Sequence, residues 1–389
     1  MKVGKPEVMS NMNKNAILKL LRDEGPLSKA EIARKLKMSF PAVSSNVRIL
    51  LESGIVLETG EGKGNNGLGR KSTLLSFNAK KGFVIGVDVG RSQIRAMCSD
   101  LLGEPVAMIK KDSNADKSGE YLYSRIENIL DEIISENKIM ADKIECICIG
   151  IPGIHDESCD KNRLAPFVDG WEDINVRERV EKKWNTKVII DNVVNLGAVG
   201  EKWKGVAQGY RDIVFINYGI GIGAGIIINN ELYRGKNNAA GEIGYMTLDR
   251  FYMRRFFKEE GALEELISGA SLNNSLKLLN SGDKDYCMEE IIEMAKAGDM
   301  NAKKIIGDSI VYLSMMMINI ISIINPELVV LSGRVGIAMF ERYRNVILDM
   351  VTAHAPYLPE FSISDLGDQG GVIGAVGVAT RYAKSKYNY

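Results

Sequence analysis

The stretch of sequence that decides the fold of this chain is Val188-Ile189-Ile190-Asp191-Asn192-Val193-Val194-Asn195-Leu196-Gly197-Ala198-Val199-Gly200-Glu201. It begins as an apolar run typical of a buried β-strand, and it continues through polar residues into a helix. In open α/β sheets, ligands bind outside the carboxyl ends of the strands. We therefore expect the polar residues of this stretch to lie in a ligand site of an α/β fold.

The chain has 389 residues, which is enough for two or three domains with sizeable cores. Its hydrophobic content of 45% and its charged content of 26% are those of an ordinary soluble protein. The net charge is zero, but residues 1–80 hold 14 Lys and Arg against 7 Asp and Glu. A basic N-terminal region on an acidic remainder indicates a polyanion-binding domain attached to a second unit.

The cysteines and the apolar runs of the sequence indicate neither a set of disulfides nor a membrane span. The odd number of cysteines, 5, and the absence of a CxxC pair argue against a set of disulfides. The most apolar run, 310–324, is short for a membrane span and contains Ser314 and Asn319, so it predicts a buried core helix. The first residues lack the pattern of a signal peptide. We expect a cytoplasmic protein with no membrane partner.

The N-terminal region has the pattern of a helix-turn-helix domain. Apolar residues at helical spacing predict a first helix within 15–22. Ser28 and Glu31 have the capping-box spacing that starts a second helix. Ser39 caps a third helix and Pro41 lies in its first turn, where a missing N–H costs little.

A predicted wing and an exposed helix face indicate DNA binding. Predicted strands at 55–59 and 72–77 flank a glycine-rich basic loop, and an arginine in such a loop suits a narrow minor groove. Small polar residues and an arginine on the outer face of the third helix are typical of a recognition helix. The alternative is a small three-helix domain that contacts proteins. We predict that the DNA-binding residues are Ser39, Phe40, Pro41, Ser44, Ser45, Arg48, Lys63, Arg70 and Lys71.

The body of the chain contains motifs that resemble those of the ROK family of repressors and sugar kinases. The opening stretch matches the family's sugar-contacting turn at Asn192, Asn195, Ala198, Gly200 and Glu201. Further matches, in the family's order, are Asp88-Val89-Gly90, Gly150-Ile151-Pro152-Gly153, Gly219 to Gly225, Ala240-Gly241-Glu242, Asn325-Pro326 and Leu366-Gly367. The resemblance covers essentially the whole chain, and within the family it is most similar to the xylose repressors.

The resemblance implies the fold and its domains. We expect an α/β protein with an N-terminal winged helix-turn-helix followed by a two-lobed actin-like (ribonuclease H-like) body of the ATPase and sugar-kinase type. The implied domains are a DNA-binding domain at 1–78, a first lobe at 79–194 completed by a C-terminal helix at 371–389, and a second lobe at 195–370.

Three positions that serve phosphoryl transfer in the kinases of the family differ in this chain. The position of the catalytic base is Val193, which cannot accept a proton, and loss of a general base alone costs about 10²–10⁴-fold. Ile220 takes the place of a phosphate-loop threonine, and Arg91 takes the place of a glycine. We therefore expect no enzyme activity, no catalytic residue and no cofactor.

The zinc-binding loop of the family is also changed. Tyr245 takes the place of its histidine, and 247–260 contains no cysteine. Four nitrogen and sulfur ligands therefore cannot be assembled there, and we expect no metal.

The resemblance implies a sugar site formed by Asn192, Glu242, Tyr245 and Glu264. Carboxylates and amides satisfy vicinal hydroxyl groups well, and such a site discriminates strongly by hydrogen bonding. The alternative for Glu242 and Glu264 is that they are surface or structural ion-pair residues.

These expectations together indicate a sugar-responsive transcriptional repressor. Its partners would be operator DNA and a monosaccharide or related sugar effector, it would act as a homodimer or a dimer of dimers, and it would control xylose or other carbohydrate catabolism. Two alternatives stay open, which are an active ROK sugar kinase with a DNA-binding appendage and a DNA-tethered scaffold that no longer binds sugar.

Overall fold

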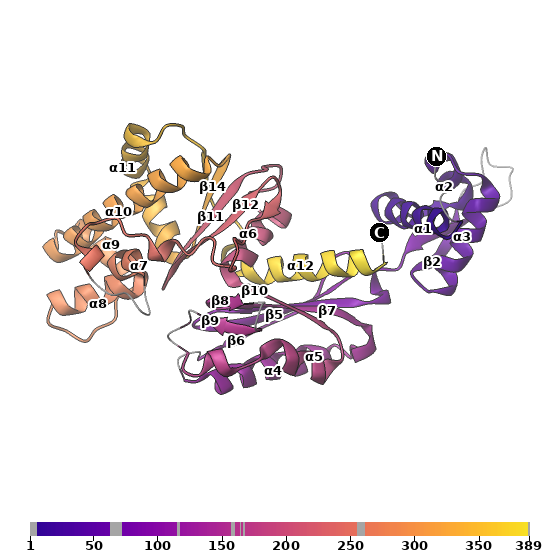
Figure 1. The fold of residues 1–389 in the computed structure, drawn as a ribbon, viewed down its shortest axis with the longest axis horizontal. Coiled ribbons are helices and arrows are strands. Elements are labelled where there is room, and N and C mark those ends of the chain that lie inside the picture. Colours follow the sequence, from indigo (N-terminus) through magenta and orange to yellow (C-terminus); the bar gives the residue numbers. More distant parts are fainter. Residues whose placement is uncertain are drawn as a thin grey trace.

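The computed structural model shows a small N-terminal domain followed by a two-lobed body (Figure 1). It describes residues 6–62, 72–114, 117–156, 160–163, 165, 168–254 and 261–387. The winged helix-turn-helix and the two-lobed α/β body that the sequence predicts are both confirmed.

The N-terminal domain packs its helices against a small sheet of strand order β1-β3-β2. The Ser28 hydroxyl accepts from the Glu31 N–H at 3.3 Å, and the Glu31 carboxylate accepts from the Ser28 N–H at 2.8 Å, so the predicted capping box is confirmed. The first helix begins earlier than the predicted 15–22, and Met9 and Met12 in its added turns are exposed. The elements are α1 (Pro6–Glu24), β1 (Leu27–Ser28), α2 (Lys29–Leu36), α3 (Phe40–Glu52), β2 (Val56–Gly62) and β3 (Ser72–Phe77).

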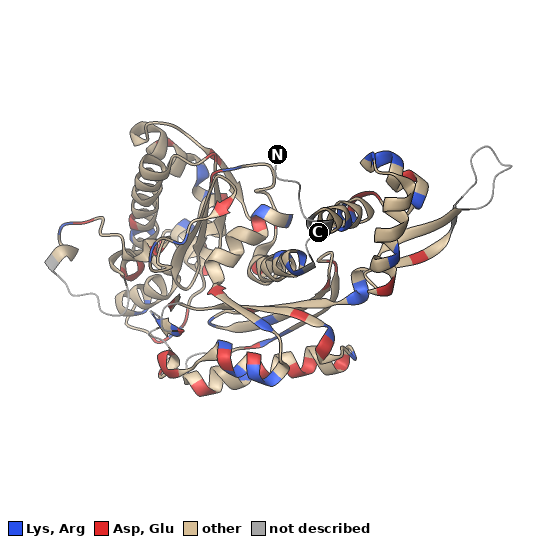
Figure 2. Ribbon diagram, turned by 45° about the vertical axis from the view of Figure 1, so that its right-hand side comes forward, with Lys and Arg blue, Asp and Glu red and all other residues tan. Residues whose placement is uncertain are grey.

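The first lobe is a mixed sheet of strand order β10-β7-β4-β5-β6. Helices α4 and α5 cover one face, and ion pairs such as Arg179–Glu120 and Lys183–Asp131 join them on the outside, where Figure 2 shows both signs of charge interspersed. The elements are β4 (Phe83–Val89), β5 (Gln93–Asp100), β6 (Pro105–Asp112), α4 (Gly119–Glu136), β7 (Ile144–Ile151), β8 (Ile154–Asp156), β9 (Lys161–Arg163), α5 (Val176–Trp184) and β10 (Lys187–Asn192).

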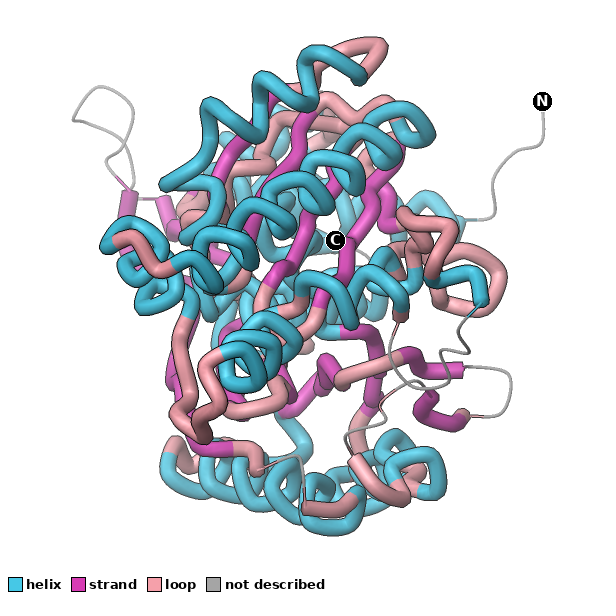
Figure 3. Tube along the Cα trace, turned by 90° about the vertical axis from the view of Figure 1, so that its left-hand side faces the viewer, coloured by secondary structure: helices cyan, strands magenta, loops and turns pink. Residues whose placement is uncertain are grey.

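The second lobe is a sheet of strand order β13-β12-β11-β14-β15 with helices over its outer face, as Figure 3 shows. The elements are β11 (Ile213–Tyr218), β12 (Ile222–Ile228), β13 (Glu231–Leu232), α7 (Ala262–Ile267), α8 (Gly269–Leu279), α9 (Met288–Ala297), α10 (Met300–Ile324), β14 (Leu328–Ser332), α11 (Arg334–His354) and β15 (Glu360–Ile363). Short 3-10 helices complete the chain at η2 (Ala79–Lys81), η3 (Ala141–Lys143), η4 (Trp171–Asp173), η5 (Ile243–Tyr245), η6 (Tyr252–Arg254) and η7 (Gly367–Gln369).

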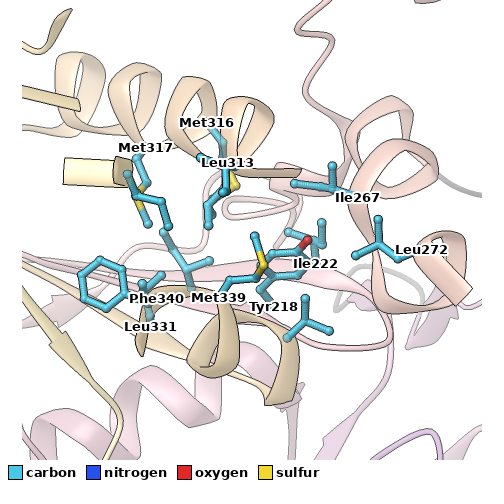
Figure 4. Close-up of a cluster of buried hydrophobic side chains, with 14 of the residues drawn as sticks. Tyr218, Ile222, Ile267, Leu272, Leu313, Met316, Met317, Leu331, Met339 and Phe340 are labelled. Carbon is cyan, nitrogen blue, oxygen red and sulfur yellow. The ribbon is translucent and has the colours of Figure 1, made fainter. Parts of the chain in front are cut away.

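Helix α10 belongs to the core of the second lobe. By length and composition alone it could cross a membrane, but 56% of its most apolar window is buried inside the protein. Leu313, Met316 and Met317 of α10 pack with Tyr218 and Phe340 in one apolar cluster (Figure 4). The core helix predicted at 310–324 is therefore confirmed.

Two helices, α6 (Val193–Lys204) and α12 (Gly370–Tyr387), lie between the two sheets. Val376 of α12 packs with Cys148 under the first sheet, and Ala198 of α6 packs with Phe215 under the second. The boundary that we predicted between 194 and 195 thus falls inside the first turn of α6, because this helix is shared by both lobes.

The two central helices cross with their backbones nearly in contact. A Cβ on Gly374 would lie 1.8 Å from the carbonyl oxygen of Leu196, and a Cβ on Gly200 would lie 2.3 Å from that of Gly370. Real Cβ atoms do not approach that closely. Only glycine therefore permits this crossing distance.

The N-terminal domain is joined to the body by a short connection, which forms hydrogen bonds on both sides. The Asn78 side chain donates to the Gly54 carbonyl at 2.8 Å, and the Leu101 N–H donates to the Ala79 carbonyl at 3.0 Å. The end of α12 also reaches α1, since burial first and the Arg22 guanidinium second lower the pKa of Lys384. Few residues therefore separate the N-terminal domain, called the head below, from the body.

The helix crossing generates a prediction about stability. Gly374→Ala should lower the free energy of unfolding by about 1–3 kcal/mol or more, because the added methyl group forces α6 and α12 apart. The matched control is Gly307→Ala in the exposed face of α10, where nothing lies within 4 Å and a gain of up to about 1 kcal/mol is expected. Urea unfolding followed by tryptophan fluorescence measures both. Equal stabilities of the two variants would contradict the crossing.

Candidate functional site

A cavity of about 300 Å³, here called the central cavity, lies between the two lobes. The first lobe contributes the turn after β4 and the junction of β10 with α6, and the second contributes the turn before β12, the segment around η5 and the start of α7. The structure brings together all the side chains that were predicted to form a sugar site, which are Asn192, Glu242, Tyr245 and Glu264.

Asn192 serves the local fold as well as the cavity wall. Its side-chain oxygen caps α6 by accepting from the Val194 N–H at 2.7 Å and from the Asn195 N–H at 3.4 Å. Its side-chain nitrogen donates to the Gly153 carbonyl at 2.7 Å. An amide nitrogen carries two protons, so one N–H of Asn192 remains for a ligand.

Glu242 and Glu264 bring two carboxyl groups to the second-lobe side of the cavity. One Glu264 oxygen accepts from the Ile222 N–H at 3.3 Å. Gly241 has a φ of +90°, and a Cβ there would lie 1.9 Å from the Ala224 carbonyl oxygen, so only glycine can hold Glu242 in this place. Burial first, and the charge of Glu264 second, raise the pKa of Glu242 to about 7. Such a pair suits a ligand rich in hydroxyl groups, which both donate and accept.

Val193 lies in the wall shared by the central cavity and a second cavity of about 290 Å³. Ile220 and Arg91 also line the central cavity, and the Ile220 side chain is 45% exposed. The three positions that differ from the kinases of the resembling family, Val193, Ile220 and Arg91, therefore line the same cavity.

The second cavity contains a cluster of charged side chains. The Arg95 guanidinium lies 3.5 Å from the Asp88 carboxylate and 2.5 Å from that of Asp368, which also pairs with Lys110 at 3.1 Å. Burial raises the pKa of Asp88 to about 6, although Arg95 opposes this shift. These groups largely neutralise one another across the junction of β5, β6 and η7.

The predicted DNA-binding face is exposed on α3. Ser39, Phe40, Pro41, Ser45 and Arg48 are exposed, and Ser44 is half-buried. The Ser39 hydroxyl accepts from the Ala42 N–H at 3.4 Å, as predicted for a cap. Arg48 lies 3.9 Å from the Glu52 carboxylate, and its side chain is 73% exposed. The other predicted contacts, Lys63, Arg70 and Lys71, lie outside the described residues.

Asn217 is a polar cavity residue that was not predicted from the sequence. It is the penultimate residue of β11 and lines both cavities. The sequence contains the pattern that would have predicted it, because Asn217, like Asn192, is a polar residue near the carboxyl end of a buried strand.

No metal centre is formed within the described ranges. Nowhere in them do three or more His, Cys, Asp or Glu side chains gather closely enough to hold an ion. Residues 255–260, which take the place of part of the family's zinc loop, lie outside the described residues. The expected absence of a metal therefore stays a prediction.

The raised pKa of Glu242 generates a prediction about pH. Between its ordinary value of 4.5 and about 7, the folded protein keeps a proton that the unfolded chain releases. The free energy of unfolding should therefore fall as the pH rises through this window. Glu242→Gln cannot titrate and should reduce the fall, whereas Glu265→Gln, at an exposed neighbour, should not. Denaturant unfolding across the window is the measurement, and equal slopes for wild type and Glu242→Gln would exclude the raised pKa.

Known proteins resemble this chain over both of its parts. The xylose repressor of Caldicellulosiruptor bescii is 28% identical over 395 residues, which are 96% of each chain. The glucokinase of Halalkalibacterium halodurans is 28% identical over 312 residues, covering 75% of this chain and 92% of the kinase. Among solved structures, a ROK family transcriptional regulator described as a homologue of the Escherichia coli MLC protein aligns with a TM-score of 0.74 at 19% identity over 96% of each chain.

Two family models match the two parts of the chain separately. The model of winged helix-turn-helix DNA-binding domains matches residues 13–56, within α1 to β2. The model of the ROK family matches residues 84–381, from β4 into α12 and therefore across both lobes. The chain thus belongs to the ROK family and carries a winged helix-turn-helix DNA-binding domain ahead of its ROK body.

Proposed function

We propose that this protein is a sugar-responsive transcriptional repressor that acts on DNA in the cytoplasm. The observation that carries the proposal is the central cavity, whose polar side chains come from both lobes, in a body joined to a DNA-binding head by a short connection. A ligand that contacts both lobes stabilises the closed body through its differential affinity for the two states. Closure then changes the placement of the head.

The same body argues against phosphoryl transfer. This reaction needs positioned phosphates and a group that orients or deprotonates the nucleophile. Val193 supplies no such group, and Arg91 and Ile220 alter the turns beside it. A glucokinase is among the relatives, so sugar kinase activity is the alternative function. Formation of a sugar phosphate that requires ATP would support this alternative.

The apolar Val193 also bears on the sugar. A hydroxyl group facing a valine loses its water partners without gaining a hydrogen bond, which costs about 1–3 kcal/mol. A pentose such as xylose in its ring form lacks the exocyclic hydroxymethyl group of glucose. It therefore has one hydroxyl group fewer to place against Val193 in the cavity wall. We therefore propose xylose as the first effector to test, in agreement with the name of the Caldicellulosiruptor relative.

We further propose that the DNA target is a pseudo-palindromic operator bound by a homodimer or a dimer of dimers. Helix α3 enters the major groove, and the wing reaches the adjacent backbone or minor groove. The spacing of two heads must match one helical turn of DNA or a multiple of it. A lobe rotation that changes this spacing weakens binding.

Arg48 provides the test of DNA placement. Arg48→Ala should weaken specific operator binding by about 1–3 kcal/mol, because an arginine on this face meets a base edge. The control is Arg34→Ala at the end of α2, which is exposed but lies off the predicted contact face. Operator titrations at fixed salt measure both. An unchanged affinity for Arg48→Ala would place the recognition surface elsewhere.

Glu242 provides the test of the effector site. Xylose should weaken operator binding by about 1–3 kcal/mol, the usual range of coupling between sites. Glu242→Ala should abolish this response, and operator binding without sugar should persist because Glu242 lies in the body. Operator titrations with and without xylose or glucose compare wild type, Glu242→Ala and the neighbouring control Glu265→Ala. A Glu242→Ala variant that responds at the wild-type sugar concentration would move the ligand site away from this cavity.

A further inference from the structure

One ion pair joins the two lobes beside the central cavity. The Arg234 guanidinium, directly after β13 of the second lobe, lies 2.5 Å from the Asp191 carboxylate at the end of β10 in the first lobe. The Asp191 side chain is 7% exposed and the Arg234 side chain is 39% exposed. The carboxylate is thus largely withdrawn from water at the lobe boundary, and its charge requires a partner.

The two oxygens of Asp191 serve different lobes. One accepts within the first lobe, from the Asn192 N–H at 2.8 Å and from the Asn195 side chain at 3.1 Å. The other accepts from Arg234. The same side chain therefore fixes the start of α6, which lines the cavity, and binds the opposite lobe. Removing Arg234 would leave a buried charge uncompensated.

Arg234 begins a segment that continues into the cavity wall. We call residues 233–240 the bridging loop. The Ala240 N–H donates to the Arg234 carbonyl at 3.0 Å, which closes the loop on itself. Its Asn238 side chain donates to the His155 carbonyl of the first lobe at 3.0 Å, so the loop touches that lobe at a second point.

The residues after the bridging loop are Gly241 and Glu242. Gly241 is fixed to β12, because its carbonyl accepts from the Ala224 N–H at 2.7 Å. The bridging loop thus runs from the ion pair at the lobe boundary to the second-lobe wall of the central cavity, where Glu242 lies.

We propose that Arg234 is a positioning residue for the effector, which pairs with Asp191 to hold the lobes at the spacing where both walls of the central cavity meet a bound sugar. This inference rests on the proposed function. The apparent affinity of a ligand falls with the fraction of protein in the binding-competent state. Loss of the pair lowers that fraction while leaving the cavity side chains intact.

The first test is a titration of operator release by xylose on the full chain. Arg234→Gln should raise the xylose concentration for half-release by about 5- to 150-fold, the usual range of coupling. The release at saturating xylose should be unchanged, and operator binding without sugar should not weaken. Asp191→Asn should give a similar shift, and the double variant should add little, because both single changes break one interaction. Arg234→Lys, which keeps the charge, should recover part of the response.

The matched control is Arg179→Gln. Arg179 also forms an arginine–carboxylate pair, with Glu120 at 2.7 Å, but both residues belong to the first lobe. This variant should respond to xylose as the wild type does. Indistinguishable titrations for Arg234→Gln and Arg179→Gln would overturn the inference.

The second test needs no sugar. Amide hydrogen exchange over residues 233–242 should be faster in Arg234→Gln than in wild type and in Arg179→Gln, since the loop is no longer held to the first lobe. Unchanged exchange would refute the inference. A wild type that keeps its operator at every xylose concentration would count against the proposed function instead, and the exchange comparison would then decide the role of Arg234 by itself.

Discussion

The close crossing of α6 and α12 is the constraint on which the rest of the structure depends. These helices form the two middle layers between the sheets, and each buries one face against a sheet and another against its partner helix. Gly200 and Gly374 permit the backbone contact. The two lobes are therefore joined at this crossing, and the first turn of α6 continues from it into the wall of the central cavity.

The crossing also explains why one helix can serve several purposes. Helix α6 is capped by Asn192 in the cavity, passes Leu196 on the α12 side and contains Glu201 in its last turn. Burial raises the pKa of Glu201, which accepts hydrogen bonds from Ser364 and from the Val206 N–H. A ligand that contacts the start of α6 thus contacts an element that packs against both lobes. The body can respond as a pair of rigid parts and does not need to deform continuously.

Much of this could be predicted from the sequence because its signals are local. The capping residues Ser28 and Ser39 specify where helices begin, and the motifs around Asn192 and Glu242 correctly identified side chains that line one cavity. The pair of Arg234 with Asp191 could not be predicted, since these residues lie 43 positions apart on different lobes. Their meeting depends on the lobe placement, which no local pattern encodes. The length of α1 was also missed, because apolar residues of its first turns such as Met9 and Met12 are exposed and form no buried face.

The position of α12 in the chain has a consequence for synthesis. Its residues Val372, Val376 and Ala379 cover the face of the first sheet that Val84, Met97 and Cys148 present. On the ribosome, this sheet emerges early, whereas α12 emerges only after the entire second lobe. Until α12 has been synthesised, the apolar face of the first sheet that it covers therefore stays exposed. The DNA-binding head already has its own helices and hairpin at that stage. A nascent chain halted before α12 would carry a folded head on an aggregation-prone body, so docking of α12 completes the core of the first lobe.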